Sequence, residues 1–277
     1  MLINSKISNF YCKRSGEPPN FVFVLMKSVI KKIIGSSGRN NLRAIQAATR
    51  AVVYGFGNDV ECPICKKTYS KFLPFNRPNA LCYGCKSLER HRLVYLFLKN
   101  ETSFFQSKSN VLHFAPEKCL HDVIRQFPDI QYQTADLMTT YIAAIGVMPD
   151  HVMSVTDIKF EDNTFDVVMC NHVFELVPDD AQGMREIYRV LKPNGYAIIQ
   201  GAVNNSVEKT IETQSLSAEE RKKIAGAHQH VRRYGRDYKD RLAAAGFEVE
   251  VSSFVKKLDH KRYGLMPDED VYVCWKR

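Results

Sequence analysis

The chain has 277 residues, 45% of them hydrophobic, and a formal net charge of +9. No stretch reaches the roughly 18–20 consecutive apolar residues that a transmembrane helix requires, and no small-residue cleavage site follows an apolar core. The sequence therefore predicts a globular protein with neither a membrane span nor a secretory signal.

Residues 1–57 are predicted to form a basic, amphipathic N-terminal segment. Positive charge is concentrated at this end, because residues 1–100 contain 17 Lys+Arg but 4 Asp+Glu. Such a segment could face the phosphates of a nucleic acid, although basic residues often do no more than solvate a surface. Residues 20–34 mix apolar residues with lysines and could contact a membrane surface, but a packed helix or a frayed terminus is the more common outcome. Neither nucleic acid nor a membrane is the favoured partner.

Residues 58–100 contain two CxxC pairs with 16 residues between them: Cys62 and Cys65, then Cys82 and Cys85. Each pair can turn two thiolates toward one metal, and four sulfurs complete the tetrahedral shell of Zn²⁺. Four protein ligands leave no open coordination position, so the zinc is predicted to be structural. The alternative is a set of unrelated buried thiols. Because the other four cysteines are scattered, we expect a reducing, cytoplasmic location and no disulfide framework. A helix over Leu88–Lys99 is predicted to lead into the next domain.

Residues 101–277 are predicted to form one α/β domain. Strand patterns alternate with helical ones such as Cys119–Phe127, Asp180–Leu191 and Tyr234–Ala245. Such alternation predicts a Rossmann-like, seven-stranded, mostly parallel sheet with helices on both faces and a ligand crevice at the carboxyl ends of the strands. The predicted strands are Asn110–Ala115, Gln131–Leu137, Val152–Ile158, Phe165–Cys170, Tyr196–Ala202, Gly246–Phe254 and Asp270–Lys276.

The loop after the first of these strands lacks the glycines of a dinucleotide-binding turn. His113, Ala115 and Glu117 stand there instead, which is poorly suited to a phosphate and argues against NAD and ATP. Asp136, followed by Leu137, lies 23 residues after His113, near the usual offset of an acid that binds ribose hydroxyls. Asp157 and Ile158 could bind adenine. The alternative for both aspartates is a helix cap after a strand. We therefore expect a cofactor with an adenosine and no phosphate.

The segment Val155–Gly201 resembles class I S-adenosyl-L-methionine-dependent methyltransferases of the type-11 kind. The motifs that carry the resemblance are Asp157, Phe165–Val168, Asn171–Glu175 and Glu186–Gly195. The chain beyond Asp59 further resembles a bacterial subgroup with an N-terminal four-cysteine zinc knuckle, through segments such as Cys85–Arg92, His113–Glu117 and His230–Gly235. The resemblance implies S-adenosylmethionine as cofactor, with Asn171 among its contacts. Two departures are the missing glycines of the first loop and Leu176, where the family usually has a second histidine.

Catalytic candidates follow the fourth strand and precede the last long helix. His172 and Glu175 form the first group, and His230 and Tyr234 the second, and the two groups are predicted to face each other across the methyl group. A general base is needed only if the acceptor must lose a proton. The alternatives are a packing or capping role for His172, and for the second group a loop-to-helix junction anchored by Arg232 and Arg233. Those two arginines would also suit an anionic acceptor.

The resulting prediction is methyl transfer to a small-molecule acceptor such as a saccharide or another metabolite. One alternative is an RNA methyltransferase that holds RNA with its zinc knuckle and basic N-terminal third. A second alternative is a non-catalytic cofactor-binding interaction module, suggested by the missing glycines.

Overall fold

The structure is a computed structural model that describes residues 55–137 and 146–277. The predicted membrane contact of residues 20–34 and nearly all of the predicted N-terminal segment lie outside these residues. Gly57–Arg277 form one compact unit. No helix among the described residues has both the length and the apolar character needed to cross a bilayer.

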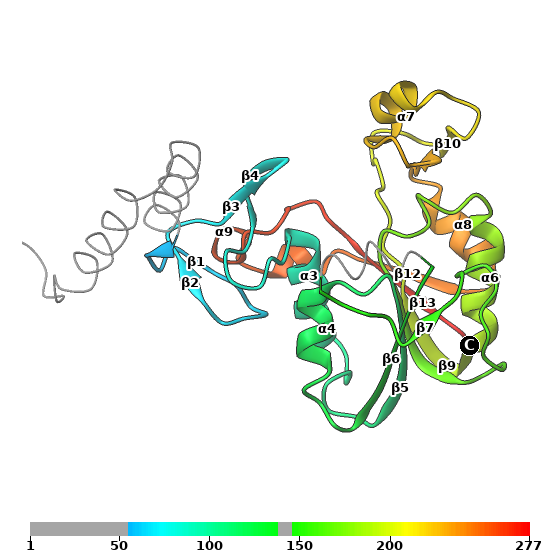
Figure 1. Ribbon diagram of the computed structural model, residues 1–277, viewed down its shortest axis with the longest axis horizontal. Helices are drawn as coiled ribbons and strands as arrows, with labels where there is room; N and C mark the ends of the chain where they lie inside the picture. Colours follow the sequence, from blue (N-terminus) through cyan, green and yellow to red (C-terminus); the bar gives the residue numbers. More distant parts are fainter. Residues whose placement is uncertain (1–54, 138–145) are drawn as a thin grey trace, which may run out of the picture. The chain divides into compact units, whose positions relative to one another are not determined.

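The central element is a seven-stranded sheet with the order β12-β13-β9-β8-β5-β6-β7 (Figure 1). β13 is antiparallel to both of its neighbours, and all other pairings are parallel. The predicted fold class is thereby confirmed. The strands are β5 (Ser109–Phe114), β6 (Ile130–Asp136), β7 (His151–Val152), β8 (Phe165–Cys170), β9 (Leu191–Ile198), β12 (Glu248–Ser252) and β13 (Val271–Trp275).

Alternating side chains of the sheet enter two apolar cores, one on each face. Val111 of β5 packs into the core formed with α3 (Glu89–Asn100), α4 (Lys118–Ile124) and the 3₁₀ turn η1 (Phe254–Lys257). Its neighbour Leu112 packs into the opposite core with α6 (Asp180–Val190) and α8 (Tyr238–Ala244). Both faces are therefore covered, which is why the strands read as nearly continuous apolar runs.

Most predicted elements differ in extent from the observed ones, and the fifth strand, predicted over Tyr196–Ala202, is observed over Leu191–Ile198. Two of the differences are explained by tertiary hydrogen bonds. The third strand ends at Val152, because residues 153–158 turn, with the Asp157 N–H donating to the Ser154 carbonyl. The last long helix starts at Tyr238, because Tyr234 forms a bridge to Val203. In both cases tertiary hydrogen bonds override the local pattern.

The two CxxC pairs lie among short strands. β1 (Val60–Glu61) pairs with β2 (Thr68–Tyr69), and β3 (Leu73–Phe75) pairs with β4 (Arg77–Leu81). The buried Arg92 of α3 joins this region to α9 (His260–Tyr263). Its guanidinium donates to the carbonyls of Ala80, Ser87, Tyr263 and Gly264. The region of residues 57–100 is thus fastened to the C-terminal part of the chain.

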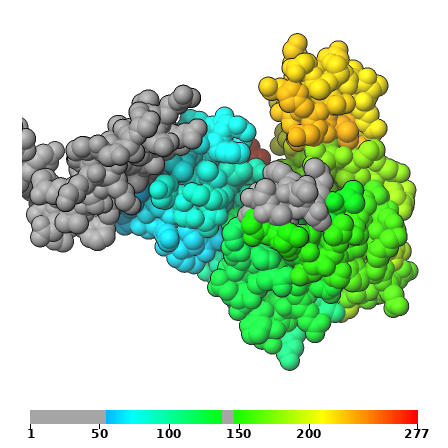
Figure 2. All heavy atoms as spheres, viewed as in Figure 1, coloured from blue at the N-terminus to red at the C-terminus, as the bar shows by residue number. Residues whose placement is uncertain are grey.

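Residues 203–237 form a lobe between β9 and α8. It contains β10 (Ile211–Glu212), α7 (Ala218–Ala225) and β11 (Arg232–Arg233), with β10 paired to β11. Figure 2 shows the lobe in yellow to orange, standing out from the sheet region. The Ser217 side chain and Glu220 form a capping box at the start of α7, which the short helix needs because little of it is buried.

Candidate active site

The strand order reverses direction between β6 and β8, which both flank β5. Ligands of such sheets bind beyond the carboxyl ends of the strands at this point. Two residues there have backbones that L-residues rarely adopt: Ala115 (φ 49°) after β5 and His172 (φ 55°) after β8. Among the described non-glycine residues, the other positive φ values belong to asparagines and to Lys66 and Lys86. Such strain is characteristic of functional sites.

The predicted ribose and adenine residues lie on β6 and after β7. Asp136 is the last residue of β6 and is paired in register with Val152 of β7. Leu137, which follows, is 64% exposed. The side chain of Asp157 is 66% exposed and lies 2.5 Å from Lys159 Nζ. Ile158 is buried, and its N–H donates to the Glu186 carboxylate.

The loop after β5 contains a buried histidine–carboxylate pair. His113 Nε2 lies 2.9 Å from Glu117 Oε2, and His113 Nδ1 lies 2.7 Å from the Tyr132 hydroxyl. Burial alone would raise the pKa of Glu117, but the contact with His113 and the charges of His113 and His91 outweigh it and lower the pKa to about 2. Glu117 is therefore an ionised carboxylate at the first turn of α4.

A second pair follows β8. His172 Nδ1 lies 3.1 Å from Glu175 Oε1, which also accepts from the backbone N–H of Ala202. Burial alone would raise the pKa of Glu175, yet the hydrogen bond and charge of His172 hold it below its usual range. Because an ionised carboxylate only accepts, Nδ1 must carry a hydrogen, and in the neutral ring Nε2 then presents its lone pair.

Several side chains at this edge of the sheet have a buried polar atom with no hydrogen-bond partner among the described residues. They come from the start of α3, the loop after β8 and the loop before β13. The set, called the open cluster below, comprises Glu89, Arg90, His91, Asn171, His172, Glu175 and Glu269. Asn171 is the extreme member, because both its amide nitrogen and its amide oxygen are unpartnered. Buried groups in this state are rare in folded proteins and call for a ligand or a functional explanation.

Sequence reasoning missed four members of this cluster: Glu89, Arg90, His91 and Glu269. A signal for the first three existed, since the charged segment Ser87–Arg92 opens an otherwise apolar helix directly after the second CxxC pair. Nothing in the local sequence distinguishes Glu269 from other loop carboxylates.

The second predicted catalytic group lies in and beside the lobe. His230 Nδ1 lies 2.8 Å from the Ala225 carbonyl, within the lobe. Tyr234 is fully buried and donates to Asp180 Oδ2 at 2.8 Å, and burial, together with the Asp180 carboxylate, raises the pKa of Tyr234. The backbone joins the two groups, because Val231 N–H donates to the Glu175 carbonyl at 2.8 Å.

Tyr234 belongs to a partly buried ionic network at the base of the lobe, called the lobe network below. It comprises Asp180, Glu212, Arg232, Tyr234 and Arg241. Arg232 donates to three carbonyls, those of Phe174, Val177 and Pro178. The neighbouring Arg233 donates to the Ile224 carbonyl. The network thus fixes the segment that follows His172 and Glu175.

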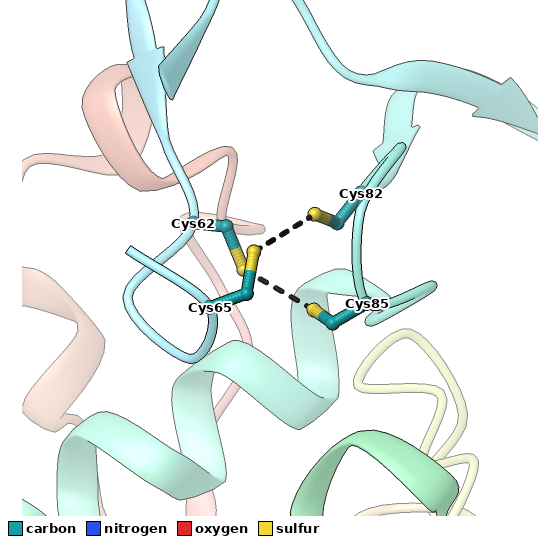
Figure 3. A group of neighbouring side chains, drawn as sticks. All are labelled: Cys62, Cys65, Cys82 and Cys85. Carbon is teal, nitrogen blue, oxygen red and sulfur yellow. Dashed lines mark hydrogen bonds between the residues drawn. The ribbon is translucent and has the colours of Figure 1, made fainter. Parts of the chain in front are cut away.

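The four cysteines of the CxxC pairs converge from two similar turns (Figure 3). Cys62 and Cys85 sulfurs lie 3.5 Å apart, and Cys65 and Cys82 sulfurs 3.6 Å apart. Tetrahedral zinc, with bonds of about 2.3 Å, would place sulfurs about 3.8 Å apart, whereas a disulfide would need about 2 Å. The donor set therefore fits structural zinc.

The two turns repeat each other in detail. Lys66 N–H donates to the Cys62 carbonyl at 2.8 Å, and Lys86 N–H donates to the Cys82 carbonyl at 3.1 Å. Both lysines have the same left-handed backbone, with φ 61° and 60°. Hydrogen bonds inside the cluster, the one with Cys62 first, lower the pKa of Cys65 to about 6. Thiolate, the form that binds metal, is thus already favoured at Cys65.

A surface depression of about 420 Å³ lies at the opposite edge of the sheet. Its lining includes Asn110, Asp166 and Lys192. The Asp166 carboxylate is occupied there by Lys192 and by the Asn110 N–H. This depression is remote from the strand switch point, and its Asp166 and Lys192 are paired with each other.

Residues 128–199 match the family described as "Methyltransferase domain". The match runs from just before β6 to just after β9 and contains Asp136, Asp157 and His172. No curated protein matches the sequence.

Solved structures similar to the chain are distant in sequence. An S-adenosylmethionine-dependent methyltransferase from Archaeoglobus fulgidus is 14% identical, with a TM-score of 0.47, over 67% of this chain and 93% of that one. The YcgJ protein from Bacillus subtilis is 16% identical, with a TM-score of 0.43, over 58% and 70%. A possible histamine N-methyltransferase from Thermotoga maritima is 16% identical, with a TM-score of 0.39, over 68% and 96%.

The strand order and the family match define the class of protein. It is an enzyme, an S-adenosylmethionine-dependent methyltransferase.

Proposed function

We propose that the protein transfers a methyl group from S-adenosylmethionine to a small-molecule acceptor, with His172 as the general base. The observation that carries this proposal is the His172–Glu175 pair. Glu175 fixes the ring through Nδ1, and the buried Nε2 has no partner among the described residues. A base held in this way can accept a proton from a hydroxyl or amine during transfer.

The residues at the strand ends fit the cofactor. Asp136, at the end of β6, would accept hydrogen bonds from the ribose hydroxyls, and Asp157 and Ile158 would lie toward the adenine. The unpartnered amide of Asn171 and the ionised Glu117 would hold polar groups of the methionine end, with His113 and Ala115 shaping the loop. When bound, the sulfonium supplies an electrophilic methyl group, so the protein mainly has to align the acceptor and remove a proton.

We further propose that the four-cysteine cluster holds one structural zinc and marks the chain as belonging to the zinc-knuckle subgroup of these enzymes. The sulfur spacing and the repeated turns support a closed site without a catalytic position. The thiolate ligands agree with a reducing cytoplasm. The RNA alternative depends on basic residues of which most lie outside the described part of the chain. The non-catalytic alternative predicts cofactor binding without turnover.

The test uses two reciprocal variants of the full-length, zinc-loaded protein. S-adenosylhomocysteine release is measured over a metabolite library, and S-adenosylhomocysteine affinity by calorimetry. We expect His172→Ala to lower turnover of the best acceptor by about 10²–10⁴-fold while affinity stays within about threefold. Asp136→Ala should weaken affinity by about tenfold or more, because charge-assisted hydrogen bonds contribute roughly 1.5–3 kcal/mol each.

His228→Ala, at an exposed histidine of the lobe, is the matched control and should change neither quantity. Undiminished turnover in the His172 variant would refute the base assignment. Binding of S-adenosylhomocysteine with no turnover of any compound would instead support the non-catalytic alternative.

A further inference from the structure

The start of α3, directly after the second CxxC turn, contributes three polar side chains to the edge of the sheet. Glu89 is 3% exposed, and its Oε1 is bonded to Arg77 while its Oε2 has no partner among the described residues. Arg90 Nε and His91 Nε2 are also buried and also have no hydrogen-bond partner among the described residues. The helix therefore presents unmet hydrogen-bonding capacity on its first turn, although its remaining turns are apolar.

The His91 ring presents a hydrogen-bond donor at Nε2. Its Nδ1 accepts from the Leu88 N–H at 3.2 Å, and burial lowers the pKa of His91 to about 4, although the Glu117 carboxylate opposes this. The neutral ring must then carry its hydrogen on Nε2, which lies 3.9 Å from Glu117 Oε1. His91 thus connects the start of α3 with the loop after β5.

Glu269 approaches the same place from the loop before β13. The His172 N–H donates to the Gln200 carbonyl, and the Gln200 side chain donates to the carbonyl of Asp270, each at 2.9 Å. These bonds tie the residue next to Glu269 to the backbone of His172. Glu269 also interacts electrostatically with Glu89, Arg90 and His172, and burial raises the pKa of Glu269.

The unpartnered atoms around His172 are mostly hydrogen-bond acceptors. Three donate, namely Arg90 Nε, His91 Nε2 and Asn171 Nδ2, and the others accept: one carboxylate oxygen each of Glu89, Glu175 and Glu269, together with Asn171 Oδ1 and His172 Nε2. Such a set suits a ligand with several hydroxyl groups, each of which can donate and accept, and it disfavours a phosphate or carboxylate because like charges repel. Arg232 and Arg233, which would suit an anion, are engaged with carbonyl oxygens instead.

We propose that Glu89, Arg90 and His91 of α3, with Glu269, form the acceptor subsite facing His172, and that the acceptor is an uncharged polyhydroxylated molecule of the saccharide type. This inference rests on the proposed function. The four-cysteine cluster is connected to this subsite through Ser87, which directly precedes Leu88 and α3. The Ser87 hydroxyl lies 3.4 Å from Cys62 Sγ and 3.3 Å from Cys85 Sγ. The metal site therefore fixes the turn from which this wall of the subsite begins.

The experiment compares matched acceptor sets with matched variants of the full-length, zinc-loaded protein. Methyl transfer is measured for hexoses, deoxyhexoses and their methyl glycosides, and for the 6-phosphates and uronates of the same sugars. We expect the preferred acceptor to be an uncharged member. Glu89→Gln and Glu269→Gln should each raise its KM at least tenfold, with S-adenosylhomocysteine affinity within threefold. Glu101→Gln, at the other end of α3, is the control and should leave KM unchanged.

Three outcomes would overturn the acceptor assignment. They are preference for a phosphorylated or uronate sugar, an unchanged KM in both variants, and a wild-type protein that binds S-adenosylhomocysteine but neither methylates any uncharged sugar nor binds one by saturation-transfer NMR. Because Glu89 is bonded to Arg77 and its variant could fold poorly, Glu269→Gln decides alone in that case. Failure of the wild-type protein to bind S-adenosylhomocysteine would instead refute the proposed function.

Discussion

The open cluster and the lobe network are two polar groups that both involve the loop after β8, and they use their hydrogen-bonding capacity differently. In the lobe network, Arg232 bonds three carbonyls and contacts two carboxylates, and Tyr234 donates to Asp180. In the open cluster, both amide atoms of Asn171 and one atom each of His172 and Glu175 have no partner among the described residues.

The difference indicates separate roles for the two groups. A buried network with all its polar groups bonded stabilises one arrangement of the chain, and breaking it leaves a charge uncompensated. A buried group with unmet hydrogen bonds destabilises the fold unless a ligand completes them. Residue type alone would make both Tyr234 and His172 candidate site residues. Unmet hydrogen bonding distinguishes them, and each substitution below is expected to affect either stability or binding.

The largest effect is expected from removing the proposed zinc, which would support the α3 wall of the open cluster. Structural zinc contributes folding free energy on the order of 10 kcal/mol, because the unfolded ligands do not preform the site. Chelation or Cys82→Ser should therefore unfold residues 58–100. Hydrogen exchange should show loss of protection there while α6 and α8, which surround the lobe network, stay protected. Less than about half an equivalent of zinc in protein purified without added metal, with Cys82→Ser equally stable, would contradict the assignment.

Arg232→Met tests the lobe network. The substitution leaves the carbonyls of Phe174, Val177 and Pro178 without their donor, and Glu212 keeps only Arg241. We expect the free energy of unfolding to fall by about 3–5 kcal/mol, as for other broken buried ion pairs. Arg233→Met removes one bond to a single carbonyl and should lower it by about 1 kcal/mol. The free energy of unfolding is measured in urea. Equal losses in the two variants would show that Arg232 stabilises the fold no more than Arg233 does.

Asn171→Leu tests the open cluster in the opposite sense. Leucine has a similar volume and removes two buried, unpartnered polar atoms, so stability should stay unchanged or rise by about 1 kcal/mol. Affinity for S-adenosylhomocysteine should fall by about tenfold or more, which corresponds to the loss of about 1.4 kcal/mol of binding free energy. A variant that is less stable yet binds normally would show that Asn171 has a structural role.

The smallest effect is a pH dependence of stability that comes from His91. Burial holds the pKa of His91 at about 4 in the fold, whereas an unfolded histidine has a pKa near 6.5. The unfolded chain therefore takes up the proton first as the pH falls, so stability is complete above about pH 6.5 and declines toward pH 4. Between pH 7.5 and 5.5 the loss should be about 1 kcal/mol.

His91→Gln should abolish that part of the slope, and His228→Gln, at an exposed histidine, should leave it in place. Glu117 adds nothing in this window, because its pKa of about 2 and the unfolded value of about 4.3 both lie below it. An identical slope in wild-type protein and His91→Gln would contradict the burial of a neutral ring.

The elements that depend on local information could be predicted from the sequence. The two CxxC turns, the alternation of strands and helices, and the placement of Asp136 at the end of β6 each follow from a short pattern, since a turn or a strand period spans only a few residues. The early end of the third strand at Val152 could not be foreseen from its apolar pattern, because a turn within residues 153–158 decides it.

Which polar residues find hydrogen-bond partners depends on the tertiary fold. Tyr234 finds its acceptor, Asp180, 54 positions away, and Arg92 finds carbonyls more than 170 positions away. His172 and Glu269 are likewise brought together by the sheet, through Gln200, and no local pattern links them. Hydrogen-bond partners far apart in the chain depend on the packing of whole elements. For that reason the sequence could predict which residue types form the candidate site. Which of these residues lack a hydrogen-bond partner among the described residues could be read only from the fold.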